Sequence, residues 1–236
     1  MNDFDASIAD ALAAPTGGWD FSFLDGRTHC AETSWSYTDL ARPLIDAAGA
    51  LLDVDTGGGE LLAAFAPLPA RTVAVESHQP AVAAARLGAL GVAVVPALAD
   101  AGGGFDLVLN RHGRLDAAGT ARALRRGGTL LSQQVGAEDC AELNAALGAP
   151  PPRPAGAWSA AVAAEALAAA GFALQEVREE FPELTFDDPG AIVFQLRMVA
   201  WQIPDFSIER HGARLRALRY PFTVRTHRFL IRASNG

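Results

Sequence analysis

The sequence predicts a doubly wound α/β fold built on a mainly parallel sheet. Five short apolar runs that suit strands alternate with helical patterns between residues 50 and 135. A glycine cluster follows the first run, and acidic or amide residues stand at the ends of others. Because ligands bind beyond the carboxyl ends of the strands in such sheets, these residues mark a candidate ligand site.

The order of elements follows from the spacing of the hydrophobic residues. Residues 1–20 are acidic and rich in alanine, which predicts a frayed helix or tail. Residues 38–48 have helical spacing, although Pro43 should limit this helix to one turn or kink it. The core elements then expected are strands at 50–54, 71–76, 92–97, 105–110 and 129–135, and helices after Gly59, at 79–91 and at 116–128.

The C-terminal part is expected to complete the same sheet. Residues 158–171 form an alanine-rich helical pattern that stops at glycine. The segments 172–181 and 222–233 alternate like strands, so they should add an antiparallel pair. Between them, a break at Pro204 predicts two helical pieces.

The domain organisation expected from these patterns has one boundary. Residues 1–45 should form an N-terminal helical extension or cap. Residues 46–236 should form the sheet domain, and a lid-like helical insertion should occupy about 183–221.

Composition narrows the classes of function and location. The 236 residues carry a net charge of -8 and are 50% hydrophobic, which argues against a general nucleic-acid binder. The arginine-rich segment 210–232 keeps an RNA substrate open as an alternative. Cys30 and Cys140 lack metal-ligand spacing and should be free thiols in a reducing cytoplasm. No signal peptide or run of about 20 apolar residues occurs, so we expect a cytoplasmic protein without membrane contact.

The stretch LLDVDTGGGE carries the most specific motif, D-x-D-x-G-x-G at 53–59. Such a loop lets a ligand approach the backbone closely, and it presents amides at a helix N-terminus. Glu76 ends the next strand, where an acid can accept hydrogen bonds from both hydroxyls of a ribose. Together these features predict an adenosine-type ligand. The alternative is that Glu76 only caps the following helix and the glycines form a tight turn.

Several segments together resemble a known family. They are LLDVDTGGGE, VAVESHQPAVAAARL, FDLVLNRHGRLD, ALRRGGTLLSQQV and GAIVFQLRMVAWQIPDF. The chain is similar over roughly residues 30–233 to class I S-adenosylmethionine-dependent methyltransferases. Within that superfamily it looks like a bacterial branch of small methyltransferases with LDVGTGGGE, NRHE and TQQVG signatures. The resemblance implies a Rossmann-like, seven-stranded sheet with an antiparallel C-terminal hairpin and helices on both faces.

The resemblance also implies a cofactor and a reaction. The cofactor would be S-adenosyl-L-methionine, with S-adenosyl-L-homocysteine as product. The methyl group would go to O or N of a small organic acceptor, the expected partner of the protein. An RNA methyltransferase is a further alternative, and the oligomeric state stays open.

Roles pass from the family to matching positions of this chain. The methionine part of the cofactor would be cradled by Asp53, Asp55, Gly57 and Gly59. Its ribose would meet Glu76 and Ser77, its adenine Leu98 and Ala97, and its methionine end Asn110. Trp35 and Tyr37 resemble a W-x-Y that closes over the cofactor, although packing on the core would equally explain Trp35.

Two positions depart from the signatures that the chain resembles. Asp55 stands where the loop usually carries glycine, and Gly113 stands where NRHE carries its acid. A carboxylate at 55 would repel the cofactor's carboxylate and attract its ammonium and sulfonium groups. Either the loop tolerates the change, or the site has been repurposed for non-methylating chemistry such as a cyclase or decarboxylase reaction.

Acceptor-side roles rest on residues near the same strand ends. His112 is a candidate general base, or else it orders a loop or binds a substrate oxygen. Gln134 is a candidate catalytic residue and Gln133 a candidate substrate ligand, although alternation allows only one of them to face the pocket. Trp201 and Phe206 would line an apolar lid over the substrate, or else pack in the core. The histidines lack metal-ligand spacing, so no metal is expected.

Overall fold

A computed structural model describes residues 3–17 and 19–236, which form two compact units. Each unit gathers segments that lie far apart in the sequence. The first unit comprises the N-terminal residues up to Thr33, Gly136–Trp158 and Glu180–His227. The second unit comprises Ser34–Val135, Ser159–Glu179 and Arg228–Gly236.

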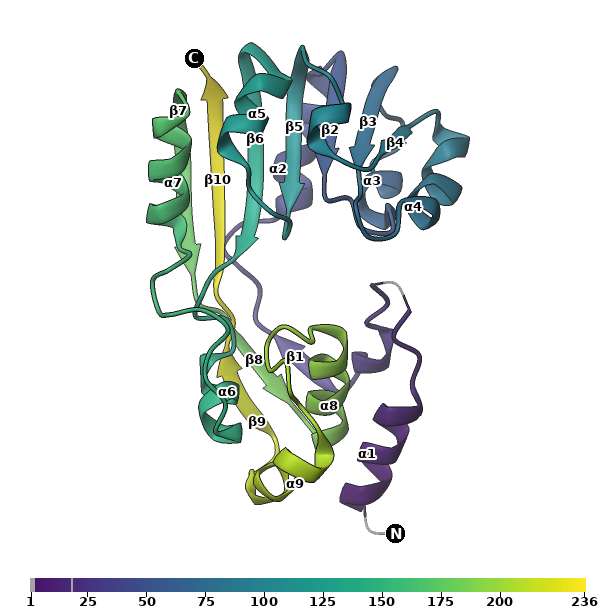
Figure 1. Cartoon of the computed structure of the whole chain (residues 1–236), viewed down its shortest axis with the longest axis vertical. Helices are drawn as coiled ribbons and strands as arrows, with labels where there is room; N and C mark the ends of the chain where they lie inside the picture. The colour runs from purple at the N-terminus through teal and green to yellow at the C-terminus, as the bar shows by residue number, and fades with distance from the viewer. Residues whose placement is uncertain (1–2, 18) are drawn as a thin grey trace. The chain divides into compact units, whose positions relative to one another are not determined.

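The second unit contains a seven-stranded sheet in the order β4-β3-β2-β5-β6-β10-β7 (Figure 1). Its strands are β2 (Ala50–Val54), β3 (Arg71–Val75), β4 (Ala93–Val95), β5 (Phe105–Arg111), β6 (Leu124–Val135), β7 (Phe172–Glu180) and β10 (Arg228–Asn235). Strands β2 to β6 pair in parallel, whereas β10 pairs with β6 antiparallel. The doubly wound, mostly parallel sheet with a C-terminal antiparallel hairpin is therefore confirmed.

Helices surround this sheet. They are α2 (Tyr37–Ala47), α3 (Glu60–Ala64), α4 (Pro80–Leu87), α5 (Ala117–Ala123) and α7 (Ala160–Ala169), with short 3-10 turns η2 (Gly88–Leu90) and η3 (Leu98–Asp100). Helices α2, α3 and α4 share one hydrophobic cluster with alternate residues of the central strands, among them Leu51, Leu107 and Leu109. Helices α5 and α7 contact each other, and α7 contacts β10. Successive strand residues point to opposite faces, and both faces of the central strands carry buried apolar residues such as Leu51 and Leu52.

Three local predictions were wrong in their boundaries. The helix expected to run to residue 128 ends at Ala123, because β6 begins at Leu124, which pairs with Phe105. The strand expected at 222–233 divides into β9 (Phe222–Arg225) and β10, which belong to different sheets. Helix α2 continues through Pro43 to Ala47, so the limit to one turn was wrong, and the alternative of a kink at Pro43 stays a prediction.

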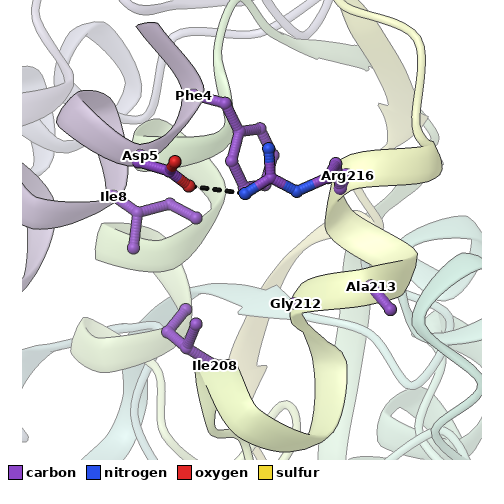
Figure 2. Close-up of a pocket in the computed structure, with 7 residues that line it drawn as sticks. All are labelled: Phe4, Asp5, Ile8, Ile208, Gly212, Ala213 and Arg216. Carbon is purple, nitrogen blue, oxygen red and sulfur yellow. Dashed lines mark hydrogen bonds and ion pairs between the residues drawn. The ribbon is translucent and has the colours of Figure 1, made fainter. Parts of the chain in front are cut away.

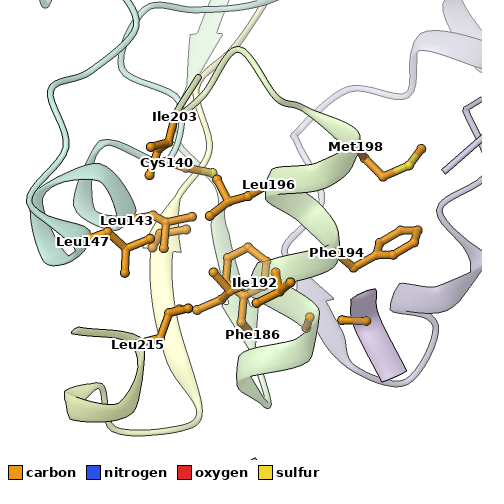
Figure 3. Packing of buried hydrophobic residues seen from close by; sticks show 14 of the residues in the cluster. Cys140, Leu143, Leu147, Phe186, Ile192, Phe194, Leu196, Met198, Ile203 and Leu215 are labelled. Carbon is orange, nitrogen blue, oxygen red and sulfur yellow. The ribbon is translucent and has the colours of Figure 1, made fainter. Parts of the chain in front are cut away.

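The first unit has its own small sheet, in the order β1-β8-β9 with antiparallel pairs. Its strands are β1 (Thr28–Cys30), β8 (Glu183–Phe186) and β9, and its helices are α1 (Asp3–Ala13), η1 (Ser22–Leu24), α6 (Ala141–Leu147), α8 (Pro189–Met198) and α9 (Ile208–Ala217). Phe186, Ile192 and Phe194 lie in its hydrophobic core (Figure 3). The segment 183–221, expected to be a helical insertion, thus contains strand β8 as well as two helices.

Helix α1 is packed, which corrects the expectation of a frayed N-terminus. Ile8 and Ala11 are buried in the core of the first unit. The Ser7 hydroxyl donates to Asp188 Oδ1 at 2.5 Å and accepts the Gly190 N–H at 3.0 Å, so α1 is fixed at the start of α8. Among the described residues, no helix combines the length and apolar character that a bilayer crossing requires.

Candidate functional site

The sheet of the second unit reverses its winding at β2. This strand lies between β3 and β5 and is parallel to both, with Val54 level with Val75 and with Asn110. The carboxyl ends of β2, β3 and β5 therefore meet at one edge, the switch point at which doubly wound sheets bind ligands. Most of the sequence-predicted site residues come from these strand ends.

The backbone of the loop after β2 has the left-handed conformations that its glycines allow. Gly57 and Gly59 have φ of 64° and 81°, in the left-handed region that favours glycine. A Cβ at Gly59, the N-cap of α3, would lie 2.8 Å from Cγ of Leu87. The third glycine therefore permits close packing of α3 on α4, the role that such a position has in nucleotide-binding loops.

Asp55 also has a left-handed backbone, with φ of 57°. Aspartate tolerates this region better than most residues do. Its Oδ2 accepts the Arg114 N–H at 2.6 Å, so it connects the loop after β2 with the loop after β5. The departure from glycine at this position is thus compatible with the loop.

Glu76 follows β3 and is only 6% exposed. Its Oε2 accepts the Gly57 N–H at 2.9 Å, and its Oε1 accepts the N–H groups of His78 and Gln79 at 2.7 and 3.1 Å. One carboxylate therefore connects the glycine loop with the residues that lead into α4. Capping accounts for two of these bonds, but the bond to Gly57 requires more than a helix cap.

Asp53 in β2 and Tyr37 at the start of α2 influence each other electrostatically. Burial raises the pKa of Asp53 to about 7, and the negative charge of Asp55 adds to this shift. Burial and the charge of Asp53 raise the pKa of Tyr37 well above its ordinary value. The Tyr37 hydroxyl is buried, and a hydrogen-bonding contact with the backbone of Asn110 opposes this shift.

Asn110 is almost fully buried at the end of β5 and ties three strands together. Its Nδ2 donates to the Val54 carbonyl at 3.1 Å. Its Oδ1 accepts from Gln134 Nε2 at 2.6 Å and from the Ser132 hydroxyl at 3.2 Å. Gln134 also donates to Ser132 at 2.8 Å, so its amide hydrogens are used inside the sheet. Gln134 thereby orients Asn110, and its predicted catalytic role stays a prediction.

Gln133 points to the opposite side and links Trp35 with His112. Trp35 Nε1 donates to Gln133 Oε1 at 2.8 Å, and Gln133 Nε2 lies 3.0 Å from His112 Nε2. An indole N–H can only donate, so the Gln133 oxygen faces Trp35 and its NH₂ group faces His112. His112 Nε2 must then accept, which places the proton of the neutral ring on Nδ1.

His112 is also held away from its charged form. Burial and the positive charges of Arg111 and Arg228 lower the pKa of His112 to about 3. His112 is exposed at the protein surface, so the charges of the two arginines and the Gln133 contact favour its neutral form alongside burial. A neutral ring with Nδ1 protonated offers a hydrogen-bond donor. The predicted role as general base stays a prediction that these contacts do not favour.

The remaining predicted residues lie at differing places. Ser77 is exposed after β3, and half-buried Leu98 begins η3, where it packs beside Gly119 of α5. Trp201 and Phe206 belong to the first unit. Trp201 is 56% exposed and meets Trp19 edge to face, whereas Phe206 stacks on His211. Their role in binding substrate therefore stays a prediction.

The contacts between the loops after β2 and β5 could not be predicted from the sequence. Arg114 supplies the N–H that binds Asp55, and Gly113 lies against the Asp55 side chain. These positions are 58 or more residues apart from Asp55 in the sequence, and only the parallel pairing of β2 with β5 brings them together. The paired departures at 55 and 113 were the available signal.

Possible metal ligands and a surface hollow were considered as other candidate sites. In the described ranges, no three His, Cys, Asp or Glu side chains are grouped as metal ligands would be. A hollow of about 320 Å³ lies between α1 and α9 in the first unit (Figure 2). It is lined by Phe4, Asp5, Ile8, Ile208, Gly212, Ala213 and Arg216. The Arg216 guanidinium pairs with Asp5 at 2.5 Å and covers the Phe4 ring, so the charges of this hollow satisfy each other.

Comparison with known proteins identifies the fold. No protein-family model matches the chain, and no curated protein sequence matches it. A functionally unknown protein from Deinococcus radiodurans R1 is similar with a TM-score of 0.62 and 14% identity, over 89% of this chain and 91% of that one. A proposed methyltransferase from Bacillus halodurans C-125 has a TM-score of 0.59 and 20% identity, over 84% of this chain and 96% of that one.

A third similar structure has a different activity. The [4+2]-cyclase SpnF has a TM-score of 0.51 and 17% identity, over 84% of this chain and 79% of that one. At such low identities, these likenesses show the fold alone. The chain has the Rossmann-like α/β fold of methyltransferases, and that fold also carries a cyclase.

Proposed function

We propose that the second unit binds S-adenosyl-L-methionine at the ends of β2, β3 and β5. In this proposal, the chain is a methyltransferase that acts on O or N of a small organic acceptor. The observation that carries it is the Glu76 carboxylate, which holds the Gly57 N–H of the glycine loop at 2.9 Å. A buried acid bonded to a glycine loop at a switch point is the arrangement that binds an adenosine-type cofactor.

The residues at this edge fit the proposed cofactor. Glu76 accepts three N–H groups, and a carboxylate has about four lone-pair sites, so it retains acceptor capacity for a ribose hydroxyl. Asp53, Asp55 and Asn110 would surround the methionine part, while Ser77 and Leu98 would lie toward the ribose and adenine. When bound, the cofactor supplies a methyl group on a sulfonium, which is a good leaving group.

The chain's own residues would position the acceptor more than deprotonate it. The Trp35–Gln133–His112 chain of contacts leaves His112 with a proton on Nδ1, and Nδ1 can donate to an acceptor oxygen or nitrogen. Orientation of this kind can supply much of the rate acceleration in a displacement reaction. In this proposal, Gln133 and His112 orient the acceptor, and Gln134 holds Asn110 in place.

The roles predicted for Trp201, Phe206 and the segment 183–221 in binding the acceptor stay predictions, because these residues belong to the first unit. An RNA substrate finds less support, because the chain carries a net charge of -8 and three of the seven arginines in 210–232 form ion pairs. Arg210 pairs with Asp205, Arg216 with Asp5, and Arg225 with Glu142.

The alternative is a protein of the same fold with non-methylating chemistry, such as a cyclase or decarboxylase. Asp55 is the observation that favours it, because a half-buried carboxylate replaces glycine beside the proposed methionine site. The likeness to a [4+2]-cyclase shows that the fold accommodates such chemistry.

One assay separates these functions. The full chain is incubated with S-adenosyl-L-methionine labelled in its methyl group and with sets of small alcohols, phenols, amines and carboxylic acids. The proposal predicts a labelled product together with an equal amount of S-adenosyl-L-homocysteine. Cofactor binding without transfer to any acceptor would favour the non-methylating alternative. Absence of cofactor binding would overturn both.

A further inference from the structure

Asp55 and Gly113, the two positions at which this chain departs from the signatures that it resembles, lie in contact with each other. A Cβ at Gly113 would lie 2.5 Å from Asp55 Cβ, 2.6 Å from Asp55 Oδ2 and 2.8 Å from Asn110 Nδ2. The Asp55 Cβ is attached directly to the backbone and cannot rotate away. A side chain at 113 and a side chain at 55 therefore exclude each other in this arrangement of the two loops.

The exchange of residues is reciprocal. The sequence resembles signatures with glycine at 55 and an acid at 113, whereas this chain carries the acid at 55 and glycine at 113. Both loops follow neighbouring parallel strands, with Val54 level with Asn110. The contact between these two loops therefore carries one carboxylate, that of Asp55, which comes from the loop after β2.

The two oxygens of Asp55 have different surroundings. Oδ2 is held by the Arg114 N–H at 2.6 Å. Oδ1 has no hydrogen-bond partner in the part of the chain that the structure describes. Burial and the charge of Glu76 raise the pKa of Asp55. The hydrogen bond from the Arg114 N–H and the charges of His78 and Arg114 act in the opposite direction but are smaller in sum. A fixed, half-buried carboxylate with one unused oxygen is suited to a cationic ligand group.

We propose that Asp55 and Gly113 act as one specificity device: the missing side chain at Gly113 makes room for Asp55, whose Oδ1 binds a cationic group of the ligand. This inference rests on the proposed function. For S-adenosyl-L-methionine and S-adenosyl-L-homocysteine, the group is the ammonium of the amino-acid tail. The pair then favours ligands with that tail over ligands that consist of the nucleoside and thioether alone.

The charge of Asp55 is tested with the full chain and two ligands. S-adenosyl-L-homocysteine carries the amino-acid tail, whereas 5′-methylthioadenosine lacks it. Asp55→Asn keeps an oxygen for the Arg114 N–H and removes the charge. Glu165→Gln, at an exposed site on α7 in the same unit, removes one charge elsewhere and serves as the control. Dissociation constants are measured by calorimetry.

The expected result is a selective loss. Asp55→Asn should weaken binding of S-adenosyl-L-homocysteine about tenfold or more, and change binding of 5′-methylthioadenosine less than about twofold. The control should leave both ligands unchanged. Unchanged binding of S-adenosyl-L-homocysteine, or equal weakening of both ligands, overturns this inference and leaves the proposed function standing. If the native chain binds neither ligand, the proposed function falls as well.

The steric part of the inference is tested by a double-mutant cycle. Gly113→Ala should lower the melting temperature because of its contact with Asp55, and Asp55→Gly should restore much of that loss in the double variant. If Gly113→Ala does not fold, a folded double variant still shows the rescue. Additive effects of the two substitutions, or a double variant no more stable than Gly113→Ala, contradict the coupling.

Discussion

Replacing Glu76 by glutamine should loosen the glycine loop and weaken cofactor binding together. The native carboxylate serves Gly57 through Oε2 and serves His78 and Gln79 through Oε1. Glutamine has one carbonyl oxygen. When that oxygen takes the place of Oε1, the NH₂ group must face the Gly57 N–H, and two donors then oppose each other.

The magnitude follows from the bonds that change. A hydrogen bond to a charged group contributes about 1.5 to 3 kcal/mol, and Glu76→Gln removes one and makes the other two uncharged. We therefore expect the second unit to lose about 2 to 3 kcal/mol of unfolding free energy. Binding of S-adenosyl-L-homocysteine should weaken about tenfold or more, because the uncharged amide is a poorer acceptor for a ribose hydroxyl.

The measurement must resolve the two units. Hydrogen exchange read out by mass spectrometry reports separately on peptides that span the glycine loop and the start of α4. These peptides should exchange faster in Glu76→Gln, while peptides of the first unit keep their native protection. Glu165→Gln, at an exposed site on α7 in the same unit, is the control and should exchange like the native chain. Native protection of the loop in Glu76→Gln, with unchanged ligand affinity, would refute this reasoning.

Three further predictions concern pH, tautomer and packing. The unfolding free energy of Asp53→Asn, compared with that of the native chain, should rise by up to about 2 kcal/mol as the pH increases from 5 to 8, as measured by urea unfolding. The reason is that burial raises the pKa of Asp53 from 3.8 to about 7, so the folded native chain loses stability as pH rises through 7; a constant difference would count against it. Gln133→Glu should raise the pKa of His112 from about 3 toward or above 6.5, because the carboxylate can accept from a protonated ring, and nitrogen NMR of the histidines measures it; an unmoved titration would contradict the contact. Gly136→Ala should lower the unfolding free energy by about 1 to 3 kcal/mol, since its Cβ would lie 2.2 Å from the buried His227 ring, and native-like thermal unfolding would exclude this clash.

The sequence was sufficient to predict the sheet of the second unit and the edge at which its ligand site lies. The runs at 50–54 and 105–110 became β2 and β5 because their residues are apolar on both faces, as central parallel strands require. Glu76 and the glycines could be predicted as site residues because each stands at the end of such a run. These patterns depend only on a few neighbouring residues and not on distant contacts.

The first unit was not predicted as a separate body, for a physical reason. Strand β1 has three residues and β8 four, too few to show alternation, and β1 pairs with β8 across more than 150 residues of sequence. Helix α1 looked frayed because its apolar stripe is short, and it is ordered by Ser7 against the start of α8. Contacts of this kind become visible only when distant segments meet.

The same limit applies to Asp55 and Gly113. Each was visible as a departure from a signature, yet their contact exists only because β2 and β5 are neighbours in the sheet. Likewise, the Trp35–Gln133–His112 chain of contacts joins positions that are 98 and 21 residues apart. The chemical character of His112 depends on that arrangement and cannot be read from its place after Asn110.

The central claim is that the ends of β2, β3 and β5 bind S-adenosyl-L-methionine, and equilibrium dialysis tests it most directly. The full chain is dialysed against labelled S-adenosyl-L-methionine, with unlabelled S-adenosyl-L-homocysteine and NAD as competitors. The account predicts saturation at one molecule per chain, displacement by S-adenosyl-L-homocysteine, and no displacement by NAD. Absence of bound label at millimolar ligand, or displacement by NAD alone, would contradict it.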